Sequence, residues 1–88
     1  DLDATLDACV RAAARHGWRT EPLGPPELGR VAFVREADSA TRPRIYLSTG
    51  MHGDEPAGPR AALRLLEENH WPEADLWLVP CLNPHGLR

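Results

Sequence analysis

Hydrophobic residues recur at helical spacing near the start of the chain and again in its second half. The first series predicts a helix over residues 2–16 that ends at Gly17, a common stop signal. The second predicts a helix over residues 56–69 whose outer face pairs Arg64 with Glu68 at i,i+4 spacing. The expected core positions are Leu2, Leu6, Cys9, Val10 and Ala13 in the first helix and Ala57, Ala61, Ala62, Leu65 and Leu66 in the second.

Three shorter apolar runs predict strands over residues 30–37, 44–49 and 75–82. The middle run is the most continuously apolar, so we expect it to be buried on both faces. Clusters of Pro, Gly and Asp over residues 22–26 and 38–43 separate the elements. The order strand, helix, strand over residues 44–82 indicates a right-handed βαβ unit. The predicted fold class is α/β, with a mixed, largely parallel sheet flanked by helices in an α/β/α arrangement.

Length and composition place the chain among small folded proteins. Its 88 residues, of which 42% are hydrophobic and 26% charged, suffice for one domain or for the N-terminal part of one. A net charge of −3 argues against binding to nucleic acid or to an anionic membrane surface. No apolar run is long enough to span a membrane.

The two cysteines and the N-terminus add little about the environment of the protein. Cys9 and Cys81 form neither a disulfide framework nor a CxxC metal knuckle, and we interpret them as buried thiols. The chain begins with the acidic run Asp1-Leu2-Asp3, whereas a signal peptide would begin with basic residues. We therefore expect a cytoplasmic location.

The loop after the second predicted strand carries the most specific chemistry. Gly50-Met51-His52-Gly53-Asp54-Glu55-Pro56 lies where open α/β sheets bind ligands, at the carboxyl end of a strand. His52 and Glu55 can aim an imidazole and a carboxylate at one point, and both are zinc ligands in catalytic sites. The HxxE spacing alone is weak, because His70-Trp71-Pro72-Glu73 repeats it in a Pro-broken connection without glycine. What distinguishes His52 and Glu55 is the strand before them, the two glycines beside them, and the proline and helix after them. Without these features they would be an ordinary loop histidine and a first-turn glutamate.

The third predicted strand also ends in a loop with candidate chemistry. Leu82-Asn83-Pro84-His85-Gly86 would fall on the same sheet edge as His52 in a parallel sheet. Asn-Pro-x-Gly is also simple turn chemistry, and nothing in the spacing requires His85 to be a third metal ligand.

Together, the two loops resemble the zinc carboxypeptidase superfamily. Members of that family begin their site with an HxxE pair and follow it with an Asn-Pro-x-Gly turn. In this sequence Gly50–Glu55 contains the HxxE pair and Val79–Gly86 contains the Asn-Pro-x-Gly turn. The His-Gly-Asp-Glu version is most similar to the bacterial branch that includes murein peptide amidases. The sister branch of succinylglutamate desuccinylases and aspartoacylases usually has Asn at the position of Asp54. The resemblance covers about residues 43–88, half of the chain.

The resemblance implies a zinc-dependent peptidase or amidase that hydrolyses an amide bond near a substrate carboxylate. His52 and Glu55 would be zinc ligands, while the third ligand, the carboxylate-binding residues and the general base have no matching position before Arg88. The chain therefore resembles an incomplete, N-terminal portion of a zinc carboxypeptidase-like domain, with a peptide or acyl-amino-acid substrate. We expect the isolated chain neither to bind zinc tightly nor to hydrolyse peptides, because catalytic zinc sites use three protein ligands.

Three alternatives remain open, one of which is an intact small α/β domain with no metal at all. The complete protein could be an acyl-amino-acid hydrolase of the succinylglutamate desuccinylase or aspartoacylase type. The chain could instead be a non-catalytic binding module, or half of a domain whose sheet is completed by another chain or by a missing C-terminal part. An unpaired, hydrophobic strand at the sheet edge would favour the binding module or half-domain.

Overall fold

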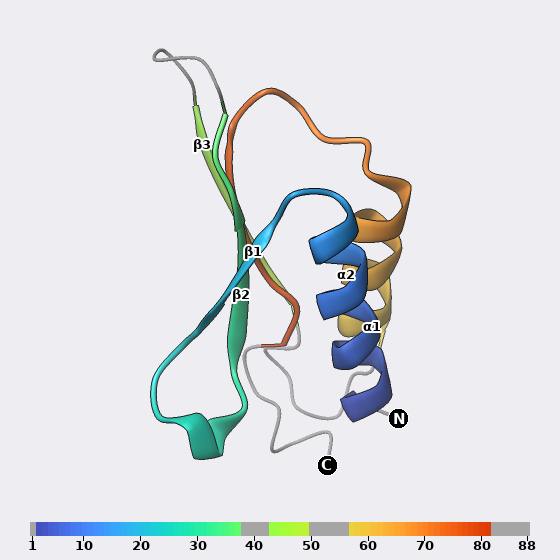
Figure 1. Cartoon of the computed structure of the whole chain (residues 1–88), viewed down its shortest axis with the longest axis vertical. Coiled ribbons are helices and arrows are strands. Elements are labelled where there is room, and N and C mark those ends of the chain that lie inside the picture. Colours follow the sequence, from blue (N-terminus) through green and yellow to red (C-terminus); the bar gives the residue numbers. More distant parts are fainter. Residues whose placement is uncertain (1, 38–42, 50–56, 82–88) are drawn as a thin grey trace.

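The computed structural model describes residues 2–37, 43–49 and 57–81, which form two α-helices packed against one mixed sheet (Figure 1). Thus an α/β fold is confirmed. No helix of the described segments is long and apolar enough to cross a membrane. The elements in chain order are α1 (Leu2–Arg15), β1 (Arg19–Pro22), the short 3-10 helix η1 (Pro26–Leu28), β2 (Val31–Arg35), β3 (Arg44–Ser48), α2 (Ala57–Glu68) and β4 (Asp75–Val79).

The sheet has the strand order β1-β2-β4-β3 and mixes both pairing types. β3 and β4 are parallel, whereas β1 pairs antiparallel with β2 and β2 pairs antiparallel with β4. The expected mixed sheet is confirmed, but the description of it as largely parallel is wrong for the described strands. Only β3 and β4 are joined through a helix, the crossover that a parallel pair requires, while β1 and β2 form a hairpin around η1.

Strand β1 was not predicted from the sequence. Its residues, Arg19-Thr20-Glu21-Pro22, are polar and run into a cluster of prolines and glycines. Pairing with β2 places Arg19 opposite Val34 and Pro22 opposite Val31, and the Leu23 N–H continues the ladder to the Arg30 carbonyl at 2.8 Å. Tertiary pairing thus overrides a weak local preference, and the proline is tolerated because β1 is an edge strand.

Both helices cover the same face of the sheet (Figure 1). The main core lies between them and the strands, and its buried members are Cys9, Ala12, Ala13, Trp18, Phe33, Ala62, Leu66, Ala74, Leu76 and Leu78. A smaller cluster of Ala32, Val34 and Val79 lies on the other face. The expected α/β/α arrangement is therefore wrong for the part of the chain that the structure describes, in which both helices pack onto the Phe33, Leu76 and Leu78 face.

Each of the two α-helices is followed within two residues by a residue with a positive φ. Gly17 has φ 79° and the Trp18 N–H bonds back to the Ala13 carbonyl at 2.9 Å, which confirms the predicted stop of the first helix. Asn69, with φ 55°, plays the corresponding part after α2. The predicted exposed pair of Arg64 and Glu68 is present at 2.8 Å. Asp3 lies in the first turn of α1, where its charge complements the helix dipole.

The expectation that the second predicted strand is buried on both faces is wrong. β3 is the last strand of the sheet, and Ile45, Tyr46 and Leu47 are 38%, 62% and 37% exposed. Only β4 flanks it among the described strands, and the core helices pack over β2 and β4. An apolar run is therefore compatible with an edge strand, although such an edge is unusual.

Candidate functional site

The parallel pair of β3 and β4 places two strand ends side by side. Their register runs from Arg44 opposite Asp75 to Ser48 opposite Val79. The ladder continues past the last pair, because the Thr49 N–H bonds to the Val79 carbonyl at 3.0 Å and the Thr49 hydroxyl donates to the Pro80 carbonyl. The chain therefore leaves the sheet after Thr49 and after Cys81 from neighbouring points on one edge.

These two departure points are where the candidate motifs begin. His52 and Glu55 belong to residues 50–56, and Asn83, Pro84 and His85 belong to residues 82–88, all outside the described residues. The structure thus describes the scaffold of the predicted site and not its ligands. The predicted βαβ order is confirmed by β3, α2 and β4, and it brings the attachment points of both loops to one sheet edge.

Helix α2 follows residues 50–56 in the chain and packs against the core. It begins at Ala57 and buries Pro59, Ala62 and Leu66 against the core. Residues 50–56, which lie outside the described residues, therefore follow the carboxyl end of β3 in the chain and precede the start of a packed helix. This is the position in which open α/β sheets bind ligands.

The described thiols are buried, as predicted, and neither forms a disulfide. Cys81 lies just after the carboxyl end of β4 and is 2% exposed. Cys9 lies in the main core on α1. Burial, with a smaller contribution from the negative charge of Glu67, raises the pKa of the Cys9 thiol from its ordinary value of 9.0 to about 12. Cys9 is therefore a neutral core residue at physiological pH and not a nucleophile.

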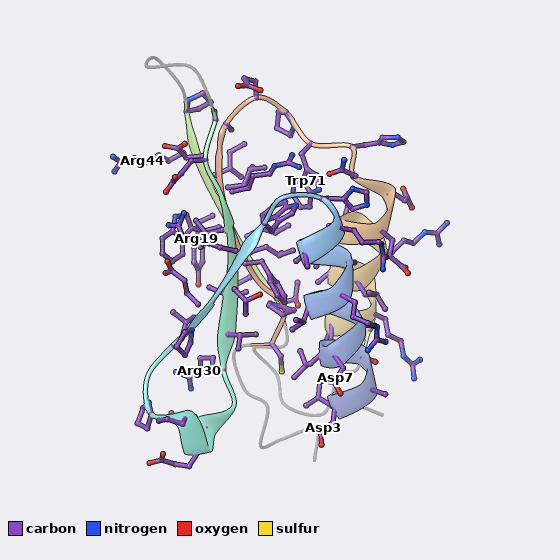
Figure 2. The ribbon with its side chains drawn as sticks, viewed as in Figure 1. Asp3, Asp7, Arg19, Arg30, Arg44 and Trp71 are labelled. Atoms are coloured by element: carbon purple, nitrogen blue, oxygen red, sulfur yellow. The ribbon has the colours of Figure 1, made fainter. Side chains whose placement is uncertain are left out.

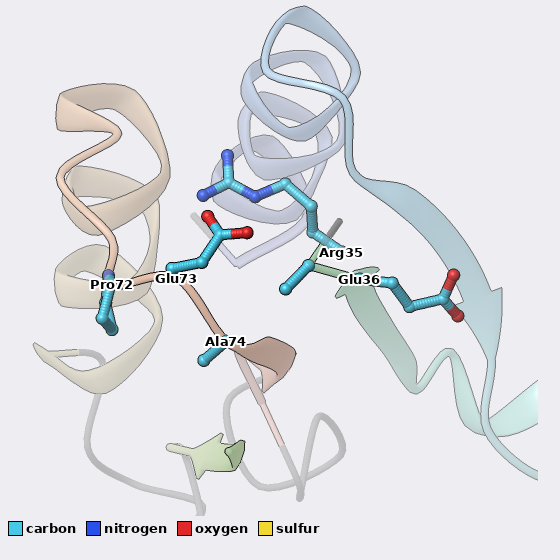
Figure 3. A pocket seen from close by; sticks show the side chains of 6 residues that line it. Arg35, Glu36, Pro72, Glu73 and Ala74 are labelled. Atoms are coloured by element: carbon cyan, nitrogen blue, oxygen red, sulfur yellow. The ribbon is translucent and has the colours of Figure 1, made fainter. Parts of the chain in front are cut away.

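The second HxxE match lies at the opposite edge of the sheet. His70 and Glu73 are exposed and precede β4, so they stand at its amino end. A hollow of about 270 Å³ there is lined by Arg35, Glu36, Ala37, Pro72, Glu73 and Ala74, and Arg35 and Glu73 point toward one another across it (Figure 3). A cation beside the carboxylate gives this hollow mixed charge, which supports the interpretation of this match as fortuitous.

Arg35 makes structural contacts with both helix ends and with Trp18 that were not predicted from the sequence. Its Nη1 donates to the Asn69 side-chain oxygen at 2.9 Å and to the His16 carbonyl at 3.3 Å, and its guanidinium lies 5.0 Å from the centre of the Trp18 ring. Trp71 meets Trp18 edge to face at 5.0 Å on the helix side of the sheet (Figure 2). The available signal was strand alternation, since Arg35 shares the core face with Val31 and Phe33.

Among residues 2–37, 43–49 and 57–81, no three His, Cys, Asp or Glu side chains gather into a group that could hold a metal ion. Comparisons with family models, curated proteins and solved structures find no match to this chain.

Proposed function

We propose that this chain is the N-terminal, metal-binding part of a zinc-dependent peptidase or amidase that cleaves an amide bond near a substrate carboxylate. A carboxypeptidase or a murein peptide amidase is the expected type. The observation that supports the proposal is the pairing of β3 with β4, whose adjacent carboxyl ends lead into the two motif loops. Both motifs therefore originate where an open α/β sheet carries its ligand site.

His52 and Glu55 would hold the zinc ion through one imidazole nitrogen and one carboxylate, donors that suit its preference for nitrogen and oxygen. When bound, zinc supplies polarisation of the scissile carbonyl and lowers the pKa of a bound water toward about 7. In the family that the sequence resembles, the third ligand, the carboxylate-binding residues and the general base follow these motifs. No residue of this sequence matches them, so the proposal assigns them to further polypeptide.

An acyl-amino-acid hydrolase of the desuccinylase type is the alternative within hydrolases, and residues binding a peptide backbone would distinguish the two. The exposed, apolar edge of β3 favours a second alternative, a binding module that acquires an additional strand. The cytoplasmic location expected from the sequence stays a prediction.

A zinc titration of the 88-residue chain tests the proposed ligands. The side-chain NMR signals of its four histidines report separately on His16, His52, His70 and His85. We expect His52 to respond first, with an affinity weaker than micromolar, because two protein ligands hold zinc less well than three. His52→Ala and Glu55→Gln should each remove that response, whereas the matched variants His70→Ala and Glu73→Gln should preserve it.

Two results would count against this account. An equal response of His70 and His52 would contradict the assignment of the site to the first HxxE motif. Stoichiometric zinc at submicromolar affinity after dialysis would contradict the incomplete ligand set, and would require a third ligand within these 88 residues.

A further inference from the structure

Arg30 is a partly buried arginine whose guanidinium has a donor without an acceptor. Among the described arginines only Arg30 and Arg35 are partly buried, and the others are exposed. Arg35 bonds to Asn69 and to the His16 carbonyl and lies against the Trp18 ring. The Nε of Arg30 is shielded from solvent, yet no described residue accepts a hydrogen bond from it. A buried donor on a charged group costs free energy when it is left unpaired, so this position favours an incoming acceptor.

The strand register places Arg30 at the edge where the candidate site lies. β2 runs antiparallel to β4, with Phe33 opposite Leu78, so the start of β2 stands beside the carboxyl end of β4. Arg30 immediately precedes β2, and continuing this register sets it level with Cys81. In Figure 2 Arg30 lies at the end of the sheet at which β4 stops. Arg30 is therefore a neighbour of the point where the second motif loop begins.

The β1–β2 hairpin fixes the backbone of Arg30 and the face on which it lies. The Arg30 carbonyl accepts from the Leu23 N–H at 2.8 Å, which sets these two residues opposite each other. Opposite residues of an antiparallel pair share a face, and Leu23 packs against the smaller cluster that contains Val79. Arg30 is therefore on the sheet face away from the helices. Gly29, with φ 64°, turns the chain from η1 into this position.

We propose that Arg30 binds a second carboxylate of the substrate, in addition to the carboxylate beside the scissile amide. This inference rests on the proposed function and names the class of substrate that the site takes, an acidic peptide. The Nε–H and one Nη–H of a guanidinium form a planar pair of donors that matches the two oxygens of a carboxylate. Such a ligand would supply the acceptor that the Arg30 Nε lacks among the described residues.

The width of the sheet sets the spacing between the two ends of such a substrate. β4 lies between β2 and β3, so Arg30 is two strand spacings, about 10 Å, from the point after Thr49 where residues 50–56 begin. An extended peptide advances about 3.3 Å per residue, so this distance corresponds to about three residues. The second carboxylate is therefore expected about three residues from the scissile bond. Arg44 cannot replace Arg30 in this role, because it lies at the opposite edge, beside the start of β4.

Peptide hydroxamates test the inference in the 88-residue chain. A hydroxamate chelates zinc, so in millimolar zinc it anchors the peptide at His52 and Glu55. Four peptides carry Glu or Gln either one or three residues from the hydroxamate, and the Nε–H NMR signals of the arginines report on contact. The peptide with Glu three residues away should shift the Arg30 signal and bind about five- to tenfold more tightly than its Gln counterpart. Glu one residue away should give no such preference.

Substitutions at two arginines supply the matched comparison. Arg30→Gln should abolish the preference for Glu over Gln, whereas Arg44→Gln at the opposite edge should preserve it. Arg30→Lys should retain only part of the preference, because an ammonium group keeps the charge and loses the planar pair of donors. Circular dichroism checks that the three variants fold.

Two results would overturn the inference. The first is an equal preference for Glu in Arg30→Gln and in the wild type. The second is a preference that does not depend on the position of Glu, as expected if Arg30 instead meets an acidic side chain of further polypeptide.

The inference and the proposed function fail in distinguishable ways. If His52 does not respond to zinc and hydroxamate, the proposed function fails and takes the inference with it. If His52 responds and no Glu preference appears, the proposed function stands and only the carboxylate site at Arg30 is contradicted.

Discussion

Neighbouring residues on α2 show what a hydrophobic pattern can and cannot decide. Leu65 and Leu66 both fit the predicted core side of the helix, yet Leu66 is fully buried and Leu65 is 40% exposed. The buried stripe runs through Pro59, Ala62 and Leu66. Adjacent helical residues are about 100° apart, so the choice between them depends on where the sheet and α1 lie. That position is a tertiary property, absent from the local pattern.

The buried Cys9 thiol predicts a pH dependence of stability. Its pKa is raised from 9.0 to about 12 in the folded state, so the unfolded chain loses the thiol proton first as pH rises. The contribution of this thiol to folding is complete below about pH 9 and is lost between pH 9 and 12. The free energy of unfolding of the wild type, relative to Cys9→Ala, should fall there by at most about 1.4 kcal/mol per pH unit.

Urea unfolding of both proteins at pH 7, 8.5, 9.5 and 10.5 would measure this difference. A constant difference across that range would show that the thiol ionises equally well in the folded chain, and would contradict its burial in the core.

At the scale of elements, Arg35 joins β2 to the ends of both helices. It bonds to His16 after α1 and to Asn69 after α2 while it stacks on Trp18. Arg35→Met keeps the apolar stem and removes these interactions, so we expect it to lower the free energy of unfolding by about 1–3 kcal/mol. Arg64→Met removes only the exposed pair with Glu68 and should cost about 0.5 kcal/mol or less. If urea unfolding showed the same loss of unfolding free energy in Arg35→Met and Arg64→Met, the proposed role of Arg35 in joining β2 to the helix ends would be contradicted.

The strands divide into those that local sequence could predict and those that it could not. β2 and β4 are nearly continuous apolar runs whose side chains fill the core, and both were predicted. β1 lacks any apolar alternation and exists because β2 supplies a pairing edge. β3 was predicted as a strand, but its exposure follows from its place at the end of the sheet, which composition does not specify.

At the scale of the molecule, the sequence predicted the βαβ unit that carries the candidate site. β3, α2 and β4 form the expected parallel crossover, which brings Thr49 and Cys81 to one sheet edge. The side of the sheet on which α1 packs was not predictable, because its apolar stripe fits either face. His52 and Glu55 stay predictions, since they lie outside the described residues.

The central claim is that a metal ion binds at the edge where β3 and β4 end. Cobalt(II) can replace zinc and broadens the NMR signals of nearby amides, so its position can be mapped on the described strands. Five strand residues span roughly 16 Å, enough to separate the two sheet edges. We predict broadening at Thr49 and Cys81, little effect at Arg44 and Asp75, and loss of the broadening in His52→Ala. Broadening centred on Asp75 and the neighbouring His70 and Glu73, or none at any amide, would contradict the account.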